Sequence, residues 1–393
     1  MRKLAYLAIA CATVITACGA DAPQPPSQPT AEPQPSVTPT PRPNLPNWKE
    51  EMPLPFPFPE GAFAPVDAFV QAQRLGRGVN FGNMLEAPKE GEWGLVVREE
   101  YFPLVRQAGF DTVRVPIRWS AHALRQPPYT IAPEFFQRID WVIENALQND
   151  LNVVINMHHY EELFKDLEGE RERFLVLWDQ IATRYRNLPP EVLFEPLNEP
   201  HGALDNESWE ELFRQVLAVI RRTNPHRNVI FTGADMGTLN GLLQAKRPND
   251  DPHLIATFHY YLPFAFTHQG AEWVEGSSAW LGTTWRGNGT QRANVDYDMD
   301  RAVLWGKQNN MPVWMGEFGA YSKADLDSRV AWTNYVARAA EARGLTWAYW
   351  EFGSGFGVYD PISLQWNEPI LKDRKSTRLN SSHKRISRMP SSA

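Results

Sequence analysis

Cysteine is nearly absent from the chain. Cys11 and Cys18 are the only two in 393 residues, and both precede residue 20. The remaining sequence can therefore form neither a disulfide framework nor a zinc–thiolate site. No G-x-G-x-x-G motif or phosphate-binding glycine loop follows the first predicted strand, which disfavours an open nucleotide-binding sheet. With 43% hydrophobic residues in a chain of this length, we expect a large folded core rather than a small disulfide-stapled protein, and no cofactor is expected.

A net positive charge is found only at the two chain ends. The formal net charge is −7, but residues 372–393 hold seven Lys and Arg against one Asp, and Arg2 and Lys3 begin the chain. The sequence between these ends carries −15. Such an acidic surface repels polyphosphate, so nucleic acid is a poor partner and a neutral substrate is expected.

The first 17 residues have the order of an export signal. Arg2 and Lys3 precede an apolar run over residues 4–15 that is too short to span a hydrocarbon core of about 30 Å. Residues 15–18 (ITAC) resemble the lipobox of bacterial lipoproteins, which implies lipidation at Cys18 and an extracytoplasmic location. The protein is then expected to contact the membrane only through this lipid. An ordinary signal cleaved near Ala17 or Ala20 is the alternative.

Two further segments fall outside the expected domain at residues 61–372. Residues 18–60 are proline-rich, with 14 of the 33 prolines between residues 23 and 59, and predict an extended linker; a ligand for a proline-binding domain is the alternative. Residues 373–393 are basic and serine-rich and resemble translated vector sequence, although a native basic tail is possible. Because a closing helix would then be cut short, we expect apolar surface exposed on the first and last strands.

Short apolar runs alternate with helical patterns through the central 300 residues. This alternation predicts an α/β fold, a single-domain (β/α)8 TIM barrel. The strands are expected to begin near residues 78, 112, 152, 192, 228, 254, 312 and 346. The clearest helical patterns cover residues 135–147, 173–185, 209–221 and 328–342.

Polar residues follow most of these strands directly. In a TIM barrel the carboxyl ends of the strands form the active face. Glu199 and Glu317 follow the fourth and seventh apolar strands, so their carboxylates can face each other across the barrel mouth. Paired carboxylates of this kind suit glycosidic bond cleavage, in which one donates a proton and the other attacks the anomeric carbon. The strand ends also carry Asn80, Asn83, Arg114, His158, His159, Asn198, His259, Tyr261 and Trp350.

The order of these motifs resembles the cellulases of glycoside hydrolase family 5. The match runs from about residue 75 to residue 371. It is carried by GVNFGN at 78–83, RVP at 114–116, HH at 158–159, NEP at 198–200, HYY at 259–261, GEFG at 316–319 and WAYW at 347–350. The segment 259–273, which contains His268 and Trp273, resembles the branch active on both glucan and mannan. The resemblance implies that Glu199 is the acid/base and Glu317 the nucleophile.

Roles for the surrounding residues follow from this resemblance and from their chemistry. Arg114 is expected to keep Glu317 ionised through a charge-assisted hydrogen bond. Asn198 is expected to bind the sugar 2-hydroxyl. The other expected contacts are Tyr261 with Glu317, His259 with Glu199, and His158 with the sugar, while His159 either touches substrate or packs behind the site. A zinc site at His158, His159 and His259 is the alternative for the histidines.

Aromatic rings are expected to stack on the apolar faces of the sugars. The resemblance places Trp350 under the ring beside the cleaved bond, and Asn83 and Glu86 on the non-reducing side. Trp273, Trp280 and Trp285 follow the sixth strand and are expected to serve product-side subsites. Core packing is expected for Trp119, Trp141, Trp178 and Trp332.

The expected activity is that of a retaining endo-β-1,4-glucanase, a monomer acting on cellulose, mixed-linkage glucan or glucomannan. A β-1,4-mannanase on the same scaffold is the first alternative. A non-catalytic glycan-binding lipoprotein is the second, and it predicts loss of one of the two glutamates. Both glutamates are present.

Overall fold

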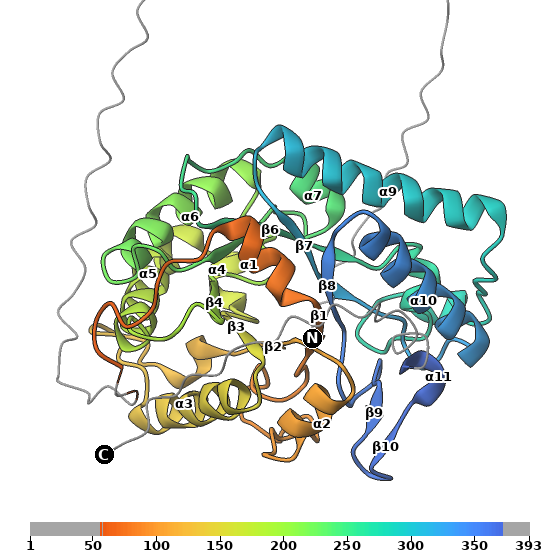
Figure 1. Ribbon diagram of the computed structural model, residues 1–393, viewed down its shortest axis with the longest axis horizontal. Coiled ribbons are helices and arrows are strands. Elements are labelled where there is room, and N and C mark those ends of the chain that lie inside the picture. Colours follow the sequence, from red (N-terminus) through yellow and green to blue (C-terminus); the bar gives the residue numbers. More distant parts are fainter. Residues whose placement is uncertain (1–55, 57, 372–393) are drawn as a thin grey trace, which may run out of the picture. The chain divides into compact units, whose positions relative to one another are not determined.

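Eight parallel strands close into a barrel in which each strand pairs with its neighbours in sequence. The computed structural model describes residue 56 and residues 58–371 (Figure 1). The predicted signal segment, Cys18, nearly all of the linker and the 373–393 tail lie outside the described residues. The strands are β1 (Arg77–Asn80), β2 (Thr112–Val115), β3 (Asn152–Asn156), β4 (Val192–Glu195), β5 (Val229–Thr232), β6 (Leu254–Tyr260), β7 (Val313–Phe318) and β8 (Thr346–Tyr349).

Helices surround the barrel, as Figure 1 shows. The helices that alternate with the strands are α2 (Tyr101–Gln107), α3 (Pro133–Gln148), α5 (Leu167–Arg184), α6 (Asn206–Arg221), α7 (Leu239–Gln244), α9 (Gly289–Gln308) and α10 (Leu326–Ala342). Shorter segments are α4 (Glu161–Lys165), α8 (Phe264–Thr267), the 3-10 turns Trp119–His122 and Ser277–Trp280, α11 (Glu368–Leu371), and the ribbon β9 (Tyr359–Asp360) with β10 (Gln365–Trp366). The predicted TIM barrel, its eight strands and the four clearest helices are confirmed.

Side-chain caps mark where several helices begin. Asp205 accepts a hydrogen bond from the Ser208 backbone N–H at the start of α6, and Asp325 does the same for Ser328 at the start of α10. Asn288 and Gln291 form a reciprocal capping box at the start of α9. These bonds satisfy backbone donors that would otherwise lack a partner in the first helical turn.

The amino end of the barrel is closed by α1 (Ala68–Leu75), which precedes β1. Asp67 caps this helix by accepting from the backbone N–H groups of Phe69 and Val70. The buried face of α1 packs on side chains that point into the barrel. This apolar layer consists of Ala68, Ala72, Leu75, Val154, Leu193, Ile230, Ile255, Trp314 and Ala348.

The expectation of exposed apolar surface on the first and last strands is wrong for the described residues. All four residues of β8 are buried, and in β1 only Arg77 is partly exposed. Arg77 forms an ion pair with Glu341 of α10, which also accepts a hydrogen bond from the Trp347 indole. In the one described turn of α11, Ile370 and Leu371 are buried. Neighbouring side chains thus cover these strands.

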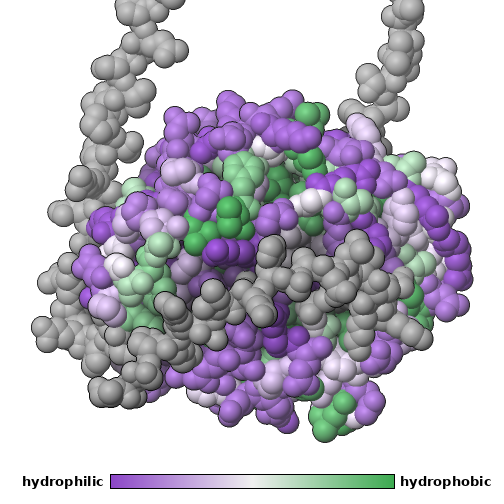
Figure 2. Space-filling model, viewed as in Figure 1, coloured by the Kyte–Doolittle hydropathy of each residue, from purple (hydrophilic) through white to green (hydrophobic). Residues whose placement is uncertain are grey.

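The packed part of the chain begins before residue 61. Phe56 and Phe58, which fall in the predicted linker, pack against the main core, and Phe56 lies 6.4 Å from Tyr185 between ring centroids. The described surface visible in Figure 2 is mostly hydrophilic, with scattered hydrophobic groups. Within residues 58–371 no helix combines the length and apolar content that crossing a bilayer requires.

Candidate active site

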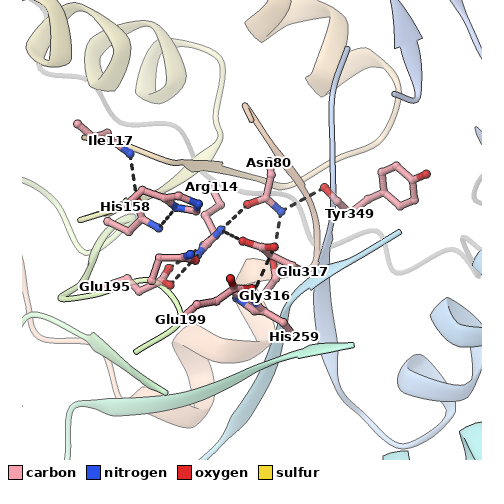
Figure 3. A network of polar contacts seen from close by, with 12 residues as sticks. Asn80, Arg114, Ile117, His158, Glu195, Glu199, His259, Gly316, Glu317 and Tyr349 are labelled. Carbon is pink, nitrogen blue, oxygen red and sulfur yellow. Dashed lines mark hydrogen bonds and ion pairs between the residues drawn. The ribbon is translucent and has the colours of Figure 1, made fainter. Parts of the chain in front are cut away.

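Arg114 lies at the centre of a buried polar network at the carboxyl end of the barrel (Figure 3). Its side chain is fully buried, and its Nη1 lies 2.5 Å from Glu317 Oε1. The same nitrogen donates to Asn80 Oδ1 at 2.9 Å, and Nη2 donates to Asn198 Oδ1 at 2.7 Å. Burial acts to lower the pKa of Arg114, but the facing carboxylates outweigh it and raise that pKa. The predicted contact between Arg114 and Glu317 is confirmed.

Glu195 is a site residue that the sequence analysis missed. Its two carboxylate oxygens accept from Arg114 Nε and Nη2, both at 2.7 Å, so the guanidinium is held in a bidentate pair. Glu195 ends β4 and is 1% exposed. The signal that could have found it is a charged residue inside the otherwise apolar VLFE strand, since a buried carboxylate requires a partner.

Asn80 fixes the barrel mouth from β1. Its amide nitrogen donates to the backbone carbonyls of Gly316 at 3.1 Å and Tyr349 at 3.2 Å, while its oxygen accepts from Arg114. One side chain thus ties together β1, β2, β7 and β8. The bond from Arg114 to Asn80 helps to hold the guanidinium beside Glu317.

The two predicted catalytic glutamates come together with His259 and Tyr261. His259 Nδ1 lies 2.7 Å from Glu199 Oε1 and 3.5 Å from Glu317 Oε2. The Tyr261 hydroxyl donates to Glu317 Oε2 at 2.8 Å. All four residues lie at the carboxyl ends of β4, β6 and β7, so the predicted pairings of His259 with Glu199 and Tyr261 with Glu317 are confirmed.

An irregularity between β6 and β7 sets this arrangement. Phe258 pairs with Met315, but the next residue, His259, pairs with Glu317, so Gly316 is an extra residue in β7. A β-bulge of this kind re-aims the side chains that follow it. Glycine is required at Gly316, because a Cβ atom there would lie 2.6 Å from Thr257 Oγ1.

The charges of these groups influence one another. Burial acts to lower the pKa of His259, but Glu317 and Glu199 reverse this and raise it. Burial acts to raise the pKa of Glu199, yet the hydrogen bond and charge of His259 lower it overall. Burial raises the pKa of Glu317 in spite of His259 and Arg114. The charged form is therefore favoured more at Glu199 than at Glu317.

Glu199, His259 and Glu317 could also be considered as metal ligands, because one potential ligand atom from each lies within 4.8 Å of the others. These groups are already bound to each other, to Tyr261 and to the Arg114 cation, which disfavours a second cation. Among the described residues, the three histidines of the zinc alternative do not form a ligand group.

His158, His159 and Trp350 form one wall of the site. The His158 ring is stacked on Trp350 with centroids 5.9 Å apart, and its Nδ1 lies 3.0 Å from the Asn156 amide nitrogen. Burial lowers the pKa of His158 well below its usual value, so the ring is neutral. His159 has a φ of 48° and contacts His158 and Trp93 edge-on.

Asn83 and Glu86 lie together in the loop after β1. The Glu86 carboxylate accepts from the backbone N–H groups of Asn83 and Met84, and it is 1% exposed. Asn83 is partly exposed. The structure therefore offers Asn83 to a ligand, while Glu86 supports the loop that carries it.

The loop after β6 carries an aromatic cluster. His268 lies 4.9 Å from Tyr261 and 6.4 Å from Trp273 between ring centroids, and Trp273 is 62% exposed. Burial lowers the pKa of His268 to about 4. Trp280 is partly exposed, but Trp285 is 1% exposed and packs against Tyr335 of α10. The expectation that Trp285 serves a product-side subsite is wrong, because Trp285 is buried against α10, where its backbone N–H donates to Ser328 Oγ at 3.0 Å.

The tryptophans expected in the core are found there. Trp119, Trp178 and Trp332 are fully buried, and Trp141 is partly buried against the main core. Their indole N–H groups, where buried, donate to backbone carbonyls, as Trp178 does to Pro196 at 2.9 Å. This agrees with the rule that a buried indole needs a hydrogen-bond acceptor.

Comparison with known proteins agrees with this geometry. Residues 76–355 match the family described as Cellulase (glycosyl hydrolase family 5). The chain is 40% identical over 302 residues to Endoglucanase H of Acetivibrio thermocellus, covering 75% of this chain and 31% of that protein. It is 30% identical to the Cellulase/esterase CelE of the same organism, covering 78% of this chain and 40% of that protein. The chain thus spans less than half the length of these two relatives.

Solved structures resemble the barrel over nearly their whole length. Thermotoga maritima Cel5A in complex with mannotriose shares 49% identity and a TM-score of 0.77, covering 78% of this chain and 99% of that one. The same protein in complex with cellobiose gives 50% identity, the same TM-score and the same coverage. The resemblance inferred from the sequence motifs is confirmed.

Proposed function

Because the chain belongs to the cellulase family of glycosyl hydrolases, family 5, we propose that it is a retaining endo-β-1,4-glucanase. The observation that carries the mechanism is the proximity of Glu199 and Glu317, whose facing oxygens lie within 4.8 Å. Retaining glycosidases have carboxyl groups about 5 to 5.5 Å apart, whereas inverting enzymes leave room for a water at about 6.5 to 9.5 Å. Names of related proteins support the endo-acting glucanase assignment.

Glu317 is the nucleophile in this proposal. It attacks the anomeric carbon and forms a glycosyl–enzyme, while Glu199 protonates the departing oxygen. Arg114 and Tyr261 both donate to Glu317, which orients its carboxylate and stabilises its negative charge. Glu199 then removes a proton from water, which hydrolyses the intermediate.

The proton for Glu199 comes from His259 in this proposal. Without substrate the pKa order favours charge on Glu199, the reverse of what a proton donor needs. The 2.7 Å contact between His259 Nδ1 and Glu199 allows the proton to move to the carboxylate without changing the net charge of the site. The result is a protonated Glu199, a neutral His259 and an ionised Glu317.

Sugar binding falls to the groups around this centre. Asn198 holds the sugar 2-hydroxyl, where hydrogen bonds strengthen in the transition state. Trp350 stacks on the sugar ring beside the cleaved bond, and His158 contacts that ring. Asn83 binds the chain on the non-reducing side, and Trp273 binds it on the product side, where it is 62% exposed.

Product stereochemistry and azide rescue test the two glutamate roles. Proton NMR of the wild-type reaction should show the β-anomer first. Glu317→Ala should be inactive until azide restores cleavage with inverted configuration. Glu199→Ala should react with an activated aryl glycoside, and azide should then give a product of retained configuration. A first-formed α-anomer would rule out retention, and exchanged azide outcomes would reverse the two roles.

A mannanase activity is the second candidate, because one of the similar structures is described as a complex with mannotriose. We propose that glucan is the main substrate and that glucomannan is also accepted. Initial rates of reducing-sugar release should be compared on carboxymethyl cellulose, barley β-glucan and galactomannan. A higher kcat/KM on galactomannan would make the protein a mannanase.

We further propose export and lipid attachment at Cys18, with residues 18–55 acting as a tether for the barrel. Metabolic labelling with a palmitate analogue should mark the parent chain but not Cys18→Ala. Equal labelling of both would exclude lipidation at this cysteine. Deleting residues 20–46 should leave activity on soluble glucan within about twofold, because a proline-rich spacer contributes no core.

A further inference from the structure

Glu351 is a buried carboxylate that the proposed mechanism does not use. It directly follows Trp350 and is 0% exposed. Its two oxygens accept from the backbone N–H groups of Gly353 at 2.8 Å, Ser354 at 2.8 and 2.9 Å, and Phe356 at 3.2 Å. One side chain thus holds the turn that follows β8.

This turn lies between two parts of the proposed sugar-binding surface. On one side of it Trp350 stacks on His158. On the other side the Phe356 ring lies 5.5 Å from His268 and 6.3 Å from Trp273 between centroids. A change in the turn would therefore move Trp350 and the aromatic cluster around His268 and Trp273 together.

On its other side, Trp350 packs against a loop that is also held by a buried glutamate. Gly82 packs so closely against this indole that a Cβ atom would lie 2.9 Å from it and 3.2 Å from the Glu351 Cβ. The loop that contains Gly82 is held by Glu86, whose carboxylate accepts from the backbone of Asn83 and Met84. The buried side chains of Glu86 and Glu351 thus hold the backbone on the two sides of Trp350.

We propose that Glu351 is a positioning residue whose ionised carboxylate orders residues 352–356 and thereby sets Trp350 and Phe356 for glucan binding, so that substrate affinity depends on the charge of Glu351. This inference rests on the proposed glucanase function. The hydrogen bonds described for Glu351 all come from N–H donors. Protonation would turn one oxygen into a donor that faces another donor, and a bond of the turn would be lost.

The surroundings of Glu351 place the protonation of its carboxylate near neutral pH. Burial raises the pKa of Glu351 to about 7 against the lowering effect of its N–H donors and of Arg329. Arg329 donates to the carbonyls of Ala320 and Phe356. Burial, with a smaller contribution from the charge of Glu351, raises the pKa of Glu86 to about 8, so Glu86 titrates in the same range. The Tyr349 hydroxyl donates to the Phe356 carbonyl at 2.8 Å.

The first test compares Glu351→Gln with the wild type on carboxymethyl cellulose. The amide should raise KM about tenfold and change kcat by less than about threefold, because it places an N–H group against the turn donors but leaves the reacting groups in place. Asp360→Asn is the matched control, since Asp360 also accepts from a backbone N–H, that of Ile362, but in an exposed turn. Its KM should equal that of the wild type. An unchanged KM in a folded Glu351→Gln would overturn the proposal.

The second test needs no variant and can overturn the proposal even if Glu351→Gln does not fold. Calorimetric binding of a thio-linked cellotetraose to the wild type should tighten about fivefold from pH 6 to pH 8. In two buffers of different ionisation enthalpy, binding near pH 7 should release a fraction of a proton. Uptake of protons, or affinity independent of pH, would exclude the inference. A wild type without hydrolytic activity would instead refute the proposed function.

Discussion

The two ends of the barrel are closed by opposite chemistry. At the amino end, α1 packs Leu75 and its neighbours onto inward-pointing apolar side chains such as Ile230 and Trp314. At the carboxyl end, the same strands bring Arg114 into contact with two carboxylates at 2.5 and 2.7 Å. The first end gains stability from removing apolar area from water. The second holds buried charges, which are costly unless they are fully paired.

This difference separates stability from chemistry within one set of strands. A strand such as β7 contributes Trp314 to the apolar layer and Glu317 to the polar network three residues later. We therefore expect the apolar layer to keep its packing when charges at the barrel mouth are changed. Changes at the two ends should therefore have separable effects, and this can be measured.

The largest expected effect is a loss of activity with little loss of stability. Glu317→Gln should lower kcat about 10,000-fold or more, because an amide cannot form the glycosyl–enzyme. Its melting temperature should stay close to that of the wild type, since Arg114 keeps its bidentate pair with Glu195. Glu341→Gln, which changes another carboxylate paired with an arginine, should keep full kcat. A melting temperature lowered by more than about 8 °C would show that Glu317 is also structural.

Arg114→Met should damage both activity and stability. Removing the cation leaves Glu195 buried without its charged partner and leaves Glu317 with His259 alone, which costs about 3 to 5 kcal/mol in the free energy of unfolding. Urea denaturation measures this loss. The double variant Arg114→Met/Glu195→Leu should regain part of the stability but no activity. If it regains none, the buried carboxylate is not the source of the loss.

Leu75→Ala should have the converse effect. The cavity left between α1 and the barrel interior should lower the free energy of unfolding by about 2 to 5 kcal/mol. Well below the melting temperature, kcat should remain within about twofold of the wild type. Phe69→Ala on the exposed face of the same helix is the control, because Phe69 is 47% exposed. A large fall in kcat for Leu75→Ala would show that the two ends are coupled.

The polar end should also make stability depend on pH. Glu86 and Glu351 have pKa values raised by burial to about 8 and about 7, so between about pH 4.5 and pH 8 the folded chain binds protons that the unfolded chain has released. Stability from these groups is present at low pH and declines as the pH rises through this range. Melting curves from pH 5 to pH 8 should show the decline. Glu351→Gln should reduce its slope, and an unchanged slope would contradict this assignment.

The smallest expected effects come from removing a helix cap, and they should be equal at the two ends of the barrel. Asp67→Ala removes the cap of α1, and Asp205→Ala removes the cap of α6. Each should cost about 1 kcal/mol in the free energy of unfolding. Thermal denaturation compares the two variants directly. A much larger loss for Asp205→Ala would show that the carboxyl end depends on helix capping as well as on the polar network.

The strand-and-helix order was predictable because each element carries its own local signal. The β-branched TVRV and NVVIN segments become β2 and β3. Glu199 and Glu317 could be identified as a pair because parallel strands in a barrel bring their carboxyl ends to one face. Trp285 was misplaced because its burial depends on how the loop after β6 packs against α10, which leaves no periodic pattern in the sequence.

The sequence alone determines which residues can do chemistry at the barrel mouth, since alternating elements and polar strand ends encode both the fold and its active face. Only the tertiary structure decides how those residues are held. Glu195 pairs with Arg114 across two strands. Glu351 accepts hydrogen bonds from the backbone of the turn that follows it. At the β-bulge, Gly316 lies so close to Thr257 that an added Cβ atom would be 2.6 Å from its Oγ1. All of these contacts depend on distances in space, which separation along the chain does not specify.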